Sequence, residues 1–218
     1  LFLFIQEAGF EALPIVSLIS LLIGMILAFV GAYQLANFGA EIYVADLVAI
    51  GMLREMGPVM AGIIMAGRTG AAFAAQLGSM QVNEEIDALK TMGISPMEYL
   101  VLPRMLALIL MMPLLVVYAD VVGIFGGMLV SVFMFDLTLA QYINQTLGSV
   151  GLASILIGIC KGAFFGLLVA SAGCFQGMRS GRSAASVGQA TTAAVVMSIV
   201  GIVVADSLIT IVTTILDI

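Results

Sequence analysis

Two long stretches of this chain carry no charged side chain, and they decide what kind of protein it can be. Residues Ala12–Ala40 and Leu137–Cys160 contain no Asp, Glu, Lys or Arg. A transmembrane barrel would instead show segments of about ten residues with alternating polarity. With 62% hydrophobic and 9% charged residues and a mean hydropathy of +1.23, the chain lacks the polar side chains to cover a water-soluble fold. The sequence therefore predicts an all-α integral membrane protein with a single domain over residues 1–218.

The hydrophobic segments predict five transmembrane helices. A helix needs about 20 apolar residues to cross the hydrocarbon core. Residues 1–11 are too short for that and mix Phe and Leu with two Glu, so we expect the end of an interfacial helix there. The expected spans are about 13–35, 48–78, 99–131, 150–171 and 190–213.

The distribution of basic residues predicts the orientation. Lys90, Arg104, Arg179 and Arg182 flank the connections after the second and fourth spans. The opposite connections, around residues 36–47 and 132–149, contain no Lys or Arg. Because cytoplasmic connections are enriched in Lys and Arg, we expect the N-terminus inside and the C-terminus outside.

A short charged segment between the second and third spans has the signals of a capped helix over residues 84–92. Asn83 can serve as N-cap, Glu84 and Glu85 suit the positive end of the helix dipole, and Gly93 suits the C-terminal end. Most helix–helix connections need only about two to eight residues in all. The extra capped helix therefore indicates an element that a partner outside the membrane binds.

Small residues recur every fourth position along several spans. The second span has Gly62, Ala66, Gly70, Ala74 and Gly78, and the third to fifth spans repeat the pattern. Such faces let two helices approach closely. They are typical of a tight bundle or of a dimer, and the sequence leaves both open.

Charged residues inside the spans need a partner or a wet cavity, because each costs at least about 2.5 kcal/mol in hydrocarbon. Arg54 and Glu55 near the start of the second span can be a pair at the interface or the polar rim of a cavity, where Arg54 could bind phosphate. Lys161 is expected at the depth of Asp120 and Asp206, either as a structural ion pair or as the lining of a substrate path. Arg68 is expected to reach the interface or a backbone carbonyl.

Several classes of function are excluded. The seven basic residues form no run, so nucleic acid is not an expected partner. The chain has no His, and Cys160 and Cys174 would lie about 21 Å apart on one helix, so neither a metal site nor a disulfide is expected. A phosphate-binding loop of the G-x-x-x-x-G-K-[ST] type is also missing, so any ATP hydrolysis must occur on another polypeptide.

The segment Leu53–Arg104 resembles the MlaE/YrbE family of ABC transporter permeases, which move phospholipids between the two membranes of Gram-negative bacteria. The matching segments read LREMGPVMAGIIMAGRTGAAFAAQLGSM, EEIDALKTMGI and YLVLPR. Similarity continues through LIGMILAFVGAYQLANFGAE upstream and through GGMLV, KGAFFG and ATTAAVV downstream.

The resemblance implies a homodimer in the bacterial inner membrane, two ATPase subunits that hold ATP and Mg²⁺, and a periplasmic hexamer of MCE-domain subunits. A STAS-domain subunit is an optional further partner. No cofactor and no catalytic residue are expected on this chain itself. The helix EEIDALKTMG would be the coupling helix, with ATPase contacts from Glu84, Glu85, Ile86, Asp87, Leu89 and Lys90.

The resemblance also implies an outward-facing lipid pocket between the two subunits. By position, its apolar lining would include Leu27, Leu35 and Phe38, and its polar rim Arg54 and Glu55. Lys161 and Asp206 fall where family members carry the same residue types.

Three other functions stay open at this point. The same architecture could carry sterols or other hydrophobic molecules. An ion-coupled secondary transporter would use Lys161, Asp120 and Asp206 as a proton relay. A purely structural membrane scaffold would tolerate Arg54→Ala and Lys161→Ala with changes in stability alone.

Overall fold

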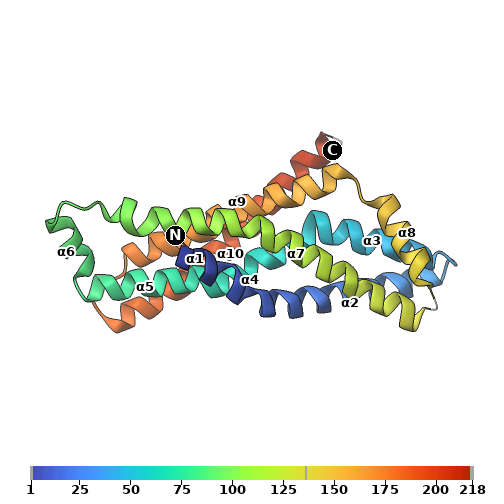
Figure 1. The fold of residues 1–218 in the computed structure, drawn as a ribbon, viewed down its shortest axis with the longest axis horizontal. Helices are drawn as coiled ribbons and strands as arrows, with labels where there is room; N and C mark the ends of the chain where they lie inside the picture. The colour runs from blue at the N-terminus through green and yellow to red at the C-terminus, as the bar shows by residue number, and fades with distance from the viewer. Residues whose placement is uncertain (1, 136, 217–218) are drawn as a thin grey trace.

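A computed structural model describes residues 2–135 and 137–216; Leu1, Asp136, Asp217 and Ile218 lie outside the described residues. Those residues form an elongated bundle of helices that run along its longest axis (Figure 1), and no strand occurs among them. Five helical segments are long and apolar enough to cross a membrane. They are Leu3–Ala36, Glu41–Val82, Met97–Met134, Leu152–Met178 and Ala184–Ile215. The predicted all-α membrane fold with five spans is confirmed.

The first span begins with the short helix α1 (Phe2–Ala8), which leads through one turn of 3-10 helix, η1 (Phe10–Ala12), into α2 (Leu13–Ala36). Arg68 from the second span donates from Nη1 to the carbonyl of Glu7 at 2.8 Å and pairs with Glu11. The guanidinium of Arg104 lies 4.6 Å from the ring centroid of Phe4. Of the two expectations for Arg68, the backbone carbonyl is the one that the structure contains.

The second span is interrupted by two π-helical turns. It begins with η2 (Glu41–Tyr43) and continues as α3 (Val44–Gly51), α4 (Gly57–Met65) and α5 (Ala71–Val82). The π turns between them are η3 (Met52–Met56) and η4 (Ala66–Gly70). They hold both arginines of this span and one of its acids: Arg54 and Glu55 lie in η3 and Arg68 lies in η4. Because π turns inside helices often mark functional sites, η3 directs attention to Arg54 and Glu55.

The remaining spans are uninterrupted. The third consists of a π turn, η5 (Met97–Val101), followed by α7 (Leu102–Met134); the fourth is α9 (Leu152–Met178) and the fifth is α10 (Ala184–Ile215). All three helices continue beyond the C-terminal ends expected from hydropathy, and α10 also begins before its expected start, whereas α9 begins two residues after it. Polar residues at a helix end can continue the backbone hydrogen bonds outside the apolar segment.

The small-residue faces are used inside the chain. A side chain at Gly24 would collide with the carbonyl of Gly123, and one at Gly126 with the carbonyl of Leu21. These contacts bring the backbones of α2 and α7 together. Gly173 on α9 meets the carbonyl of Gly70 in the same way. The glycines therefore tighten the bundle of one subunit.

A helix that was not predicted, α8 (Leu139–Ser149), lies in the connection between the third and fourth spans. Thr138 and Gln141 form a capping box at its start, Tyr142 is buried, and Gln145 donates to Asp46 at 2.7 Å. Figure 1 shows α8 at the opposite end of the bundle from α6 (Glu85–Thr91). We refer to these two ends as the α8 end and the α6 end.

The capped helix between the second and third spans exists, but its first cap differs from the prediction. Glu84, not Asn83, is the N-cap residue, with a φ of 61° in the left-handed region. The Asn83 side chain instead donates to the Glu85 carboxylate at 3.1 Å. At the other end Gly93, with a φ of 76°, donates to Lys90 and is followed by the Ile94 to Leu89 bond of a Schellman motif.

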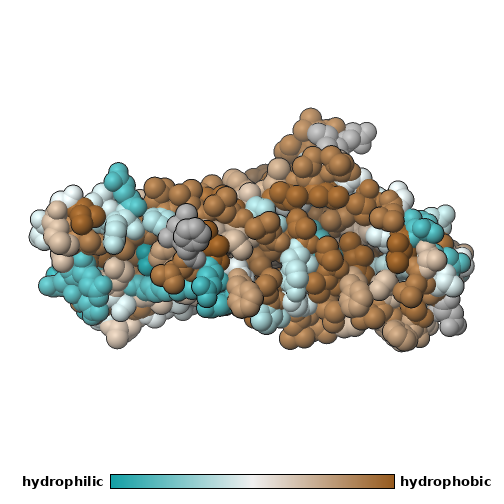
Figure 2. All heavy atoms as spheres, in the orientation of Figure 1, coloured by the Kyte–Doolittle hydropathy of each residue, from teal (hydrophilic) through white to brown (hydrophobic). Residues whose placement is uncertain are grey.

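The polarity of the surface differs between the middle of the bundle and its two ends. Hydrophobic residues cover most of the length of the bundle in Figure 2, and hydrophilic residues gather at its two ends and beside the N-terminal helix. The apolar band matches a bundle whose middle faces lipid and whose ends face water.

Candidate functional site

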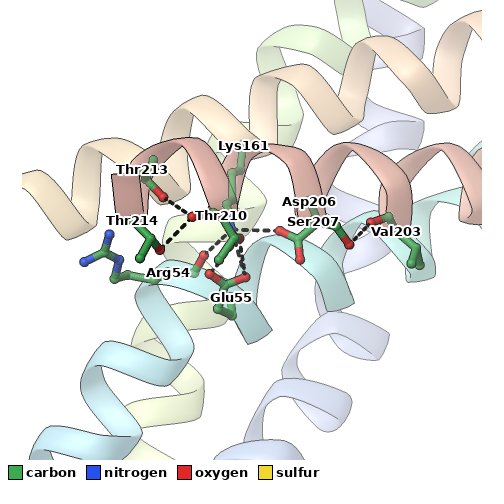
Figure 3. A network of polar contacts seen from close by, with 9 residues as sticks. All are labelled: Arg54, Glu55, Lys161, Val203, Asp206, Ser207, Thr210, Thr213 and Thr214. Atoms are coloured by element: carbon green, nitrogen blue, oxygen red, sulfur yellow. Dashed lines mark hydrogen bonds and ion pairs between the residues drawn. The ribbon is translucent and has the colours of Figure 1, made fainter. Parts of the chain in front are cut away.

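Lys161 is the one charged residue of α9 and is only 1% exposed. A buried ammonium is tolerated only where partners replace its water. Its partners come from two other spans, η3 in the second and α10 in the fifth (Figure 3). We call Lys161, Glu55, Asp206, Thr210 and the Arg54 carbonyl the lysine centre.

Three hydrogen bonds use the three N–H groups of the Lys161 ammonium. Nζ donates to the carbonyl of Arg54 at 2.9 Å, to Glu55 Oε2 at 2.8 Å and to Thr210 Oγ1 at 2.9 Å. Asp206 Oδ1 also lies 2.8 Å from Nζ, as an ion pair without hydrogen-bond geometry. The ammonium is therefore fully satisfied, and Asp206 adds charge to it.

Thr210 completes the lysine centre, although it was not among the site residues predicted from the sequence. Its hydroxyl donates to Glu55 Oε1 at 3.0 Å and accepts from Lys161. Asp206 and Thr210 are four residues apart on α10 and so share one helix face. Because Asp206 was already predicted inside the membrane, the spacing of four residues could have identified Thr210.

The ion pairs of the lysine centre hold three spans together. One ammonium faces two carboxylates, so the group carries a formal net charge of −1 with both acids ionised. Removing one partner of a buried ion pair costs about 3–5 kcal/mol, because the other charge stays buried without compensation. The second, fourth and fifth spans are therefore fixed to one another at this depth.

Asp120 does not join the lysine centre as the sequence analysis expected. It is buried on α7, and its Oδ1 has no hydrogen-bond partner among the described residues. A side chain at Gly57 would collide with that oxygen, which places the carboxyl group against α4. The reason is the rotation of each helix about its own axis. Asp120 and Lys161 can lie at the same depth and still point in different directions.

Arg54 contributes through its backbone. Its carbonyl accepts from Lys161, while Figure 3 shows its side chain extending away from Lys161. The side chain is half-buried. Arg54 and Glu55, which are adjacent in η3, therefore face different surroundings.

The residues expected to line a lipid slot lie along α2. Leu27 and Leu35 are partly buried against an apolar cluster between α2 and α3, which also contains Met52 and Met56 of η3. Phe38 follows α2 and is 84% exposed. One side of η3 thus packs in this apolar cluster while another side holds the lysine centre.

At the α6 end, the acidic residues of α6 meet a basic residue from the connection before α10. Arg182 Nη2 lies 2.8 Å from Asp87 Oδ2, and Nη1 lies 3.6 Å from Glu84. Lys90 also pairs with Asp87 at 3.0 Å, and its hydrogen bond and charge lower the pKa of Asp87, with a further contribution from Arg182. The sequence indicated only the orientation of the bundle through Arg182, and this link between the two connections could not be read from it.

The apolar residues of α6 face inward. Ile86 is 1% exposed within the main apolar core, and Leu89 packs against the same core. The expectation that Ile86 forms part of a docking surface is wrong for this conformation, because its own subunit already covers it. Leu89 is only partly covered, and its contact with an ATPase stays a prediction. Met92, which directly follows α6 and is 64% exposed, is a large apolar side chain available there.

Metal-ligating side chains do not cluster in the described ranges: no three Cys, Asp or Glu residues are placed to hold a metal ion. The arrangement at the lysine centre is an electrostatic joint between spans.

Comparison with known proteins adds the family. A sequence profile described as Permease MlaE matches residues 2–212. A probable ABC transporter permease protein of Rickettsia typhi is 39% identical over 202 residues, which cover 93% of this chain and 78% of the relative.

Two more distant relatives carry more specific names. The intermembrane phospholipid transport system permease protein MlaE of Haemophilus influenzae is 34% identical, with 86% of this chain and 72% of the relative covered. The chloroplastic protein TRIGALACTOSYLDIACYLGLYCEROL 1 of Arabidopsis thaliana is 32% identical, with 93% of this chain and 58% of the relative covered. Together with the five-span fold, these matches show that the chain belongs to the MlaE permease family, the membrane subunits of ABC transporters.

Proposed function

We propose that this chain is the permease of an ABC transporter that moves phospholipids between the bacterial inner membrane and a periplasmic MCE-domain carrier. The single observation that carries the proposal is the family match over nearly the whole chain, which includes a relative named for intermembrane phospholipid transport. The chain supplies the membrane path, and a separate ATPase supplies the energy.

The proposed assembly has partners at both ends of the bundle. Two copies of this chain would stand side by side, with an ATPase dimer carrying ATP and Mg²⁺ at the α6 end and the MCE hexamer at the α8 end. A STAS-domain subunit could join the ATPases. The basic residues near the α6 end support a cytoplasmic position for it, which would put the N-terminus inside and the C-terminus in the periplasm.

The ATPase contact surface on α6 would be acidic with one apolar anchor. Glu84, Glu85 and the Asp87–Lys90 pair lie on the surface of the helix, and exposed Met92 follows it. Ile86 and Leu89 would then act indirectly, by joining α6 to the core so that the helix moves with α5.

A continuous set of contacts leads from α6 to the proposed lipid slot. Arg182 ties α6 to the segment that begins α10, and α10 carries Asp206 and Thr210 to Lys161. Lys161 in turn holds η3, whose Met52 and Met56 pack with Leu27 and Leu35. Movement of α6 would thus reach the slot through α10 and η3.

In this slot the acyl chains would lie along Leu27, Leu35 and Phe38, with the headgroup near Arg54 and Glu55. The structure gives less support to a proton relay of Lys161, Asp120 and Asp206, because Asp120 lies apart from the other two. Sterols or other hydrophobic molecules would use the same slot, and the identity of the bound lipid separates these cargoes.

The coupling assignment is tested by co-purification. The double variant Glu85→Lys with Met92→Asp reverses the charge and removes the apolar anchor on exposed positions, so we expect the ATPase to be lost. Glu41→Lys makes the same charge change at the α8 end and should retain it. An ATPase retained by the double variant at the level of the Glu41→Lys control contradicts the assignment of α6.

The cargo assignment is tested by mass spectrometry of lipid extracted from the purified complex. We expect phospholipid in stoichiometric amounts, with less retained by Leu27→Trp, which fills the proposed slot. A sterol in its place would change the cargo, and a folded complex free of lipid would contradict a lipid slot.

A further inference from the structure

An apolar groove lies at the α6 end, away from the lysine centre. It has a volume of about 330 Å³ and lies between η5 with the start of α7 on one side and the end of α9 on the other. Its exposed lining is apolar and includes Val101, Cys174 and three methionines, Met97, Met105 and Met178. Methionine side chains adapt to irregular ligands, so this groove suits a flexible hydrocarbon chain.

The groove follows the helix axis into the apolar band. Ser171 and Arg179 both line it, and eight residues of helix correspond to about 12 Å. Arg179 is the C-cap of α9 and is exposed, whereas Ser171 lies two turns deeper. The groove therefore has a charged mouth at the end of the bundle and an apolar interior.

Arg179 is placed to receive an anion at that mouth. Its guanidinium lies 5.1 Å from the ring centroid of Phe175, and among the described residues it forms no ion pair. Arg182, three residues later, differs because Asp87 and Glu84 already pair with it. Basic groups between transmembrane helices near the membrane surface are a common site for acidic lipid headgroups.

We infer that this groove binds one acyl chain of an anionic phospholipid from the leaflet at the α6 end, with the lipid phosphate on Arg179. The charge complementarity identifies the occupant, since a planar guanidinium can bind two phosphate oxygens at once. This groove and Phe38 lie on opposite sides of the lysine centre. Lipid binding in the groove requires only that the chain lies in a bilayer. It does not depend on which cargo is transported.

The chain contains no Trp, which allows a clean fluorescence test. Phe175→Trp places the sole tryptophan on the groove and keeps an aromatic ring under Arg179. The full chain would be reconstituted in liposomes that contain lipid with brominated acyl chains, which quench nearby tryptophan. The brominated lipid is either phosphatidylglycerol, which is anionic, or phosphatidylcholine, which is zwitterionic.

The expected result is about fivefold tighter quenching by brominated phosphatidylglycerol, the factor that corresponds to ~1 kcal/mol for one basic residue beside anionic lipid. Leu102→Trp, an exposed position on the first turn of α7 outside the groove lining, should show equal quenching by both lipids. Adding Arg179→Gln to Phe175→Trp should abolish the preference, and adding Ser171→Leu should weaken quenching by both lipids.

Two results would overturn the inference. One is equal quenching of Phe175→Trp by the two lipids, as for bulk lipid around any helix. The other is an anionic preference that survives Arg179→Gln. Failure of the proposed transport function would leave these quenching results unchanged, so the two proposals are tested separately.

Discussion

The lysine centre and the α6 end both join charged side chains from separate segments of the chain, but in opposite surroundings. Lys161 is 1% exposed, whereas the side chains of Arg182 and Glu84 at the α6 end are 62% and 68% exposed. A buried ion pair is costly to break, while an exposed pair contributes little because water and salt compete with it. The lysine centre is therefore suited to holding spans in place, and the α6 end to exchanging its partners.

The largest effect is expected for Lys161→Met. This change leaves Glu55, Asp206 and the Arg54 carbonyl without their shared donor, so we expect a loss of about 3–5 kcal/mol in the free energy of unfolding. Unfolding in mixed detergent micelles measures it. Adding Glu55→Gln and Asp206→Asn to Lys161→Met should restore much of the lost stability. Unchanged stability of Lys161→Met alone would contradict a stabilising role of the ion pairs at Lys161.

Within the lysine centre, Glu55→Gln should destabilise more than Asp206→Asn. Glu55 accepts hydrogen bonds from both Lys161 and Thr210, and Asp206 contacts Lys161 without hydrogen-bond geometry. We expect about 1–3 kcal/mol for Glu55→Gln, the range for losing hydrogen bonds to a charged group. The same unfolding assay compares the two variants, and the reverse order would assign the main partnership to Asp206.

At the α6 end, Gly93→Ala should cost about 1 kcal/mol. Its φ of 76° disfavours any residue with a Cβ, while no atom lies within 4 Å of the added methyl group. The effect should stay local and appear as faster hydrogen exchange in α6. Gly148→Ala, which also has open space but no positive φ, is the matched control and should change nothing in α6.

The smallest effect is expected for the Asp87 pairs. Lys90 and then Arg182 lower the pKa of Asp87 below its usual 3.8, so the pairing is fully present above that value and is lost as the pH falls through the lowered pKa. Hydrogen exchange in α6 should therefore be constant from neutral pH down to 3.8, after correction for its intrinsic pH dependence. Salt should weaken the pairs throughout this pH range. A change in the exchange rate above pH 3.8 would contradict a lowered pKa of Asp87.

Much of the fold could be predicted, because charge-free apolar segments can be stable only in lipid and must be helical there. Helix α8 was not predicted because its sequence is polar enough to resemble a connection. The one signal of a helix start there is the capping box of Thr138 and Gln141. The π turns could not be predicted, since they depend on how α4 and α5 pack on α9. Their consequence is that Arg54 and Glu55, adjacent in sequence, have different surroundings.

The candidate site was predicted in part for a related reason. Depth along a span follows from counting residues, so Asp206 was correctly placed near Lys161. The direction of a side chain depends on helix rotation, which led to the wrong inclusion of Asp120 and the omission of Thr210. For Ile86 and Leu89 the sequence revealed an apolar face, but it could not tell whether a partner or the core covers that face.

The most direct test of the account is ATP-driven phospholipid transfer by the reconstituted transporter that carries Lys161→Met, Glu55→Gln and Asp206→Asn together. These changes remove the charges while leaving no unpaired ion, so the complex should stay folded and keep its ATPase. The account predicts that ATP is still hydrolysed but lipid transfer is lost, because α10 no longer moves η3. Transfer at the wild-type rate would contradict it and would leave the lysine centre as a structural ion pair alone.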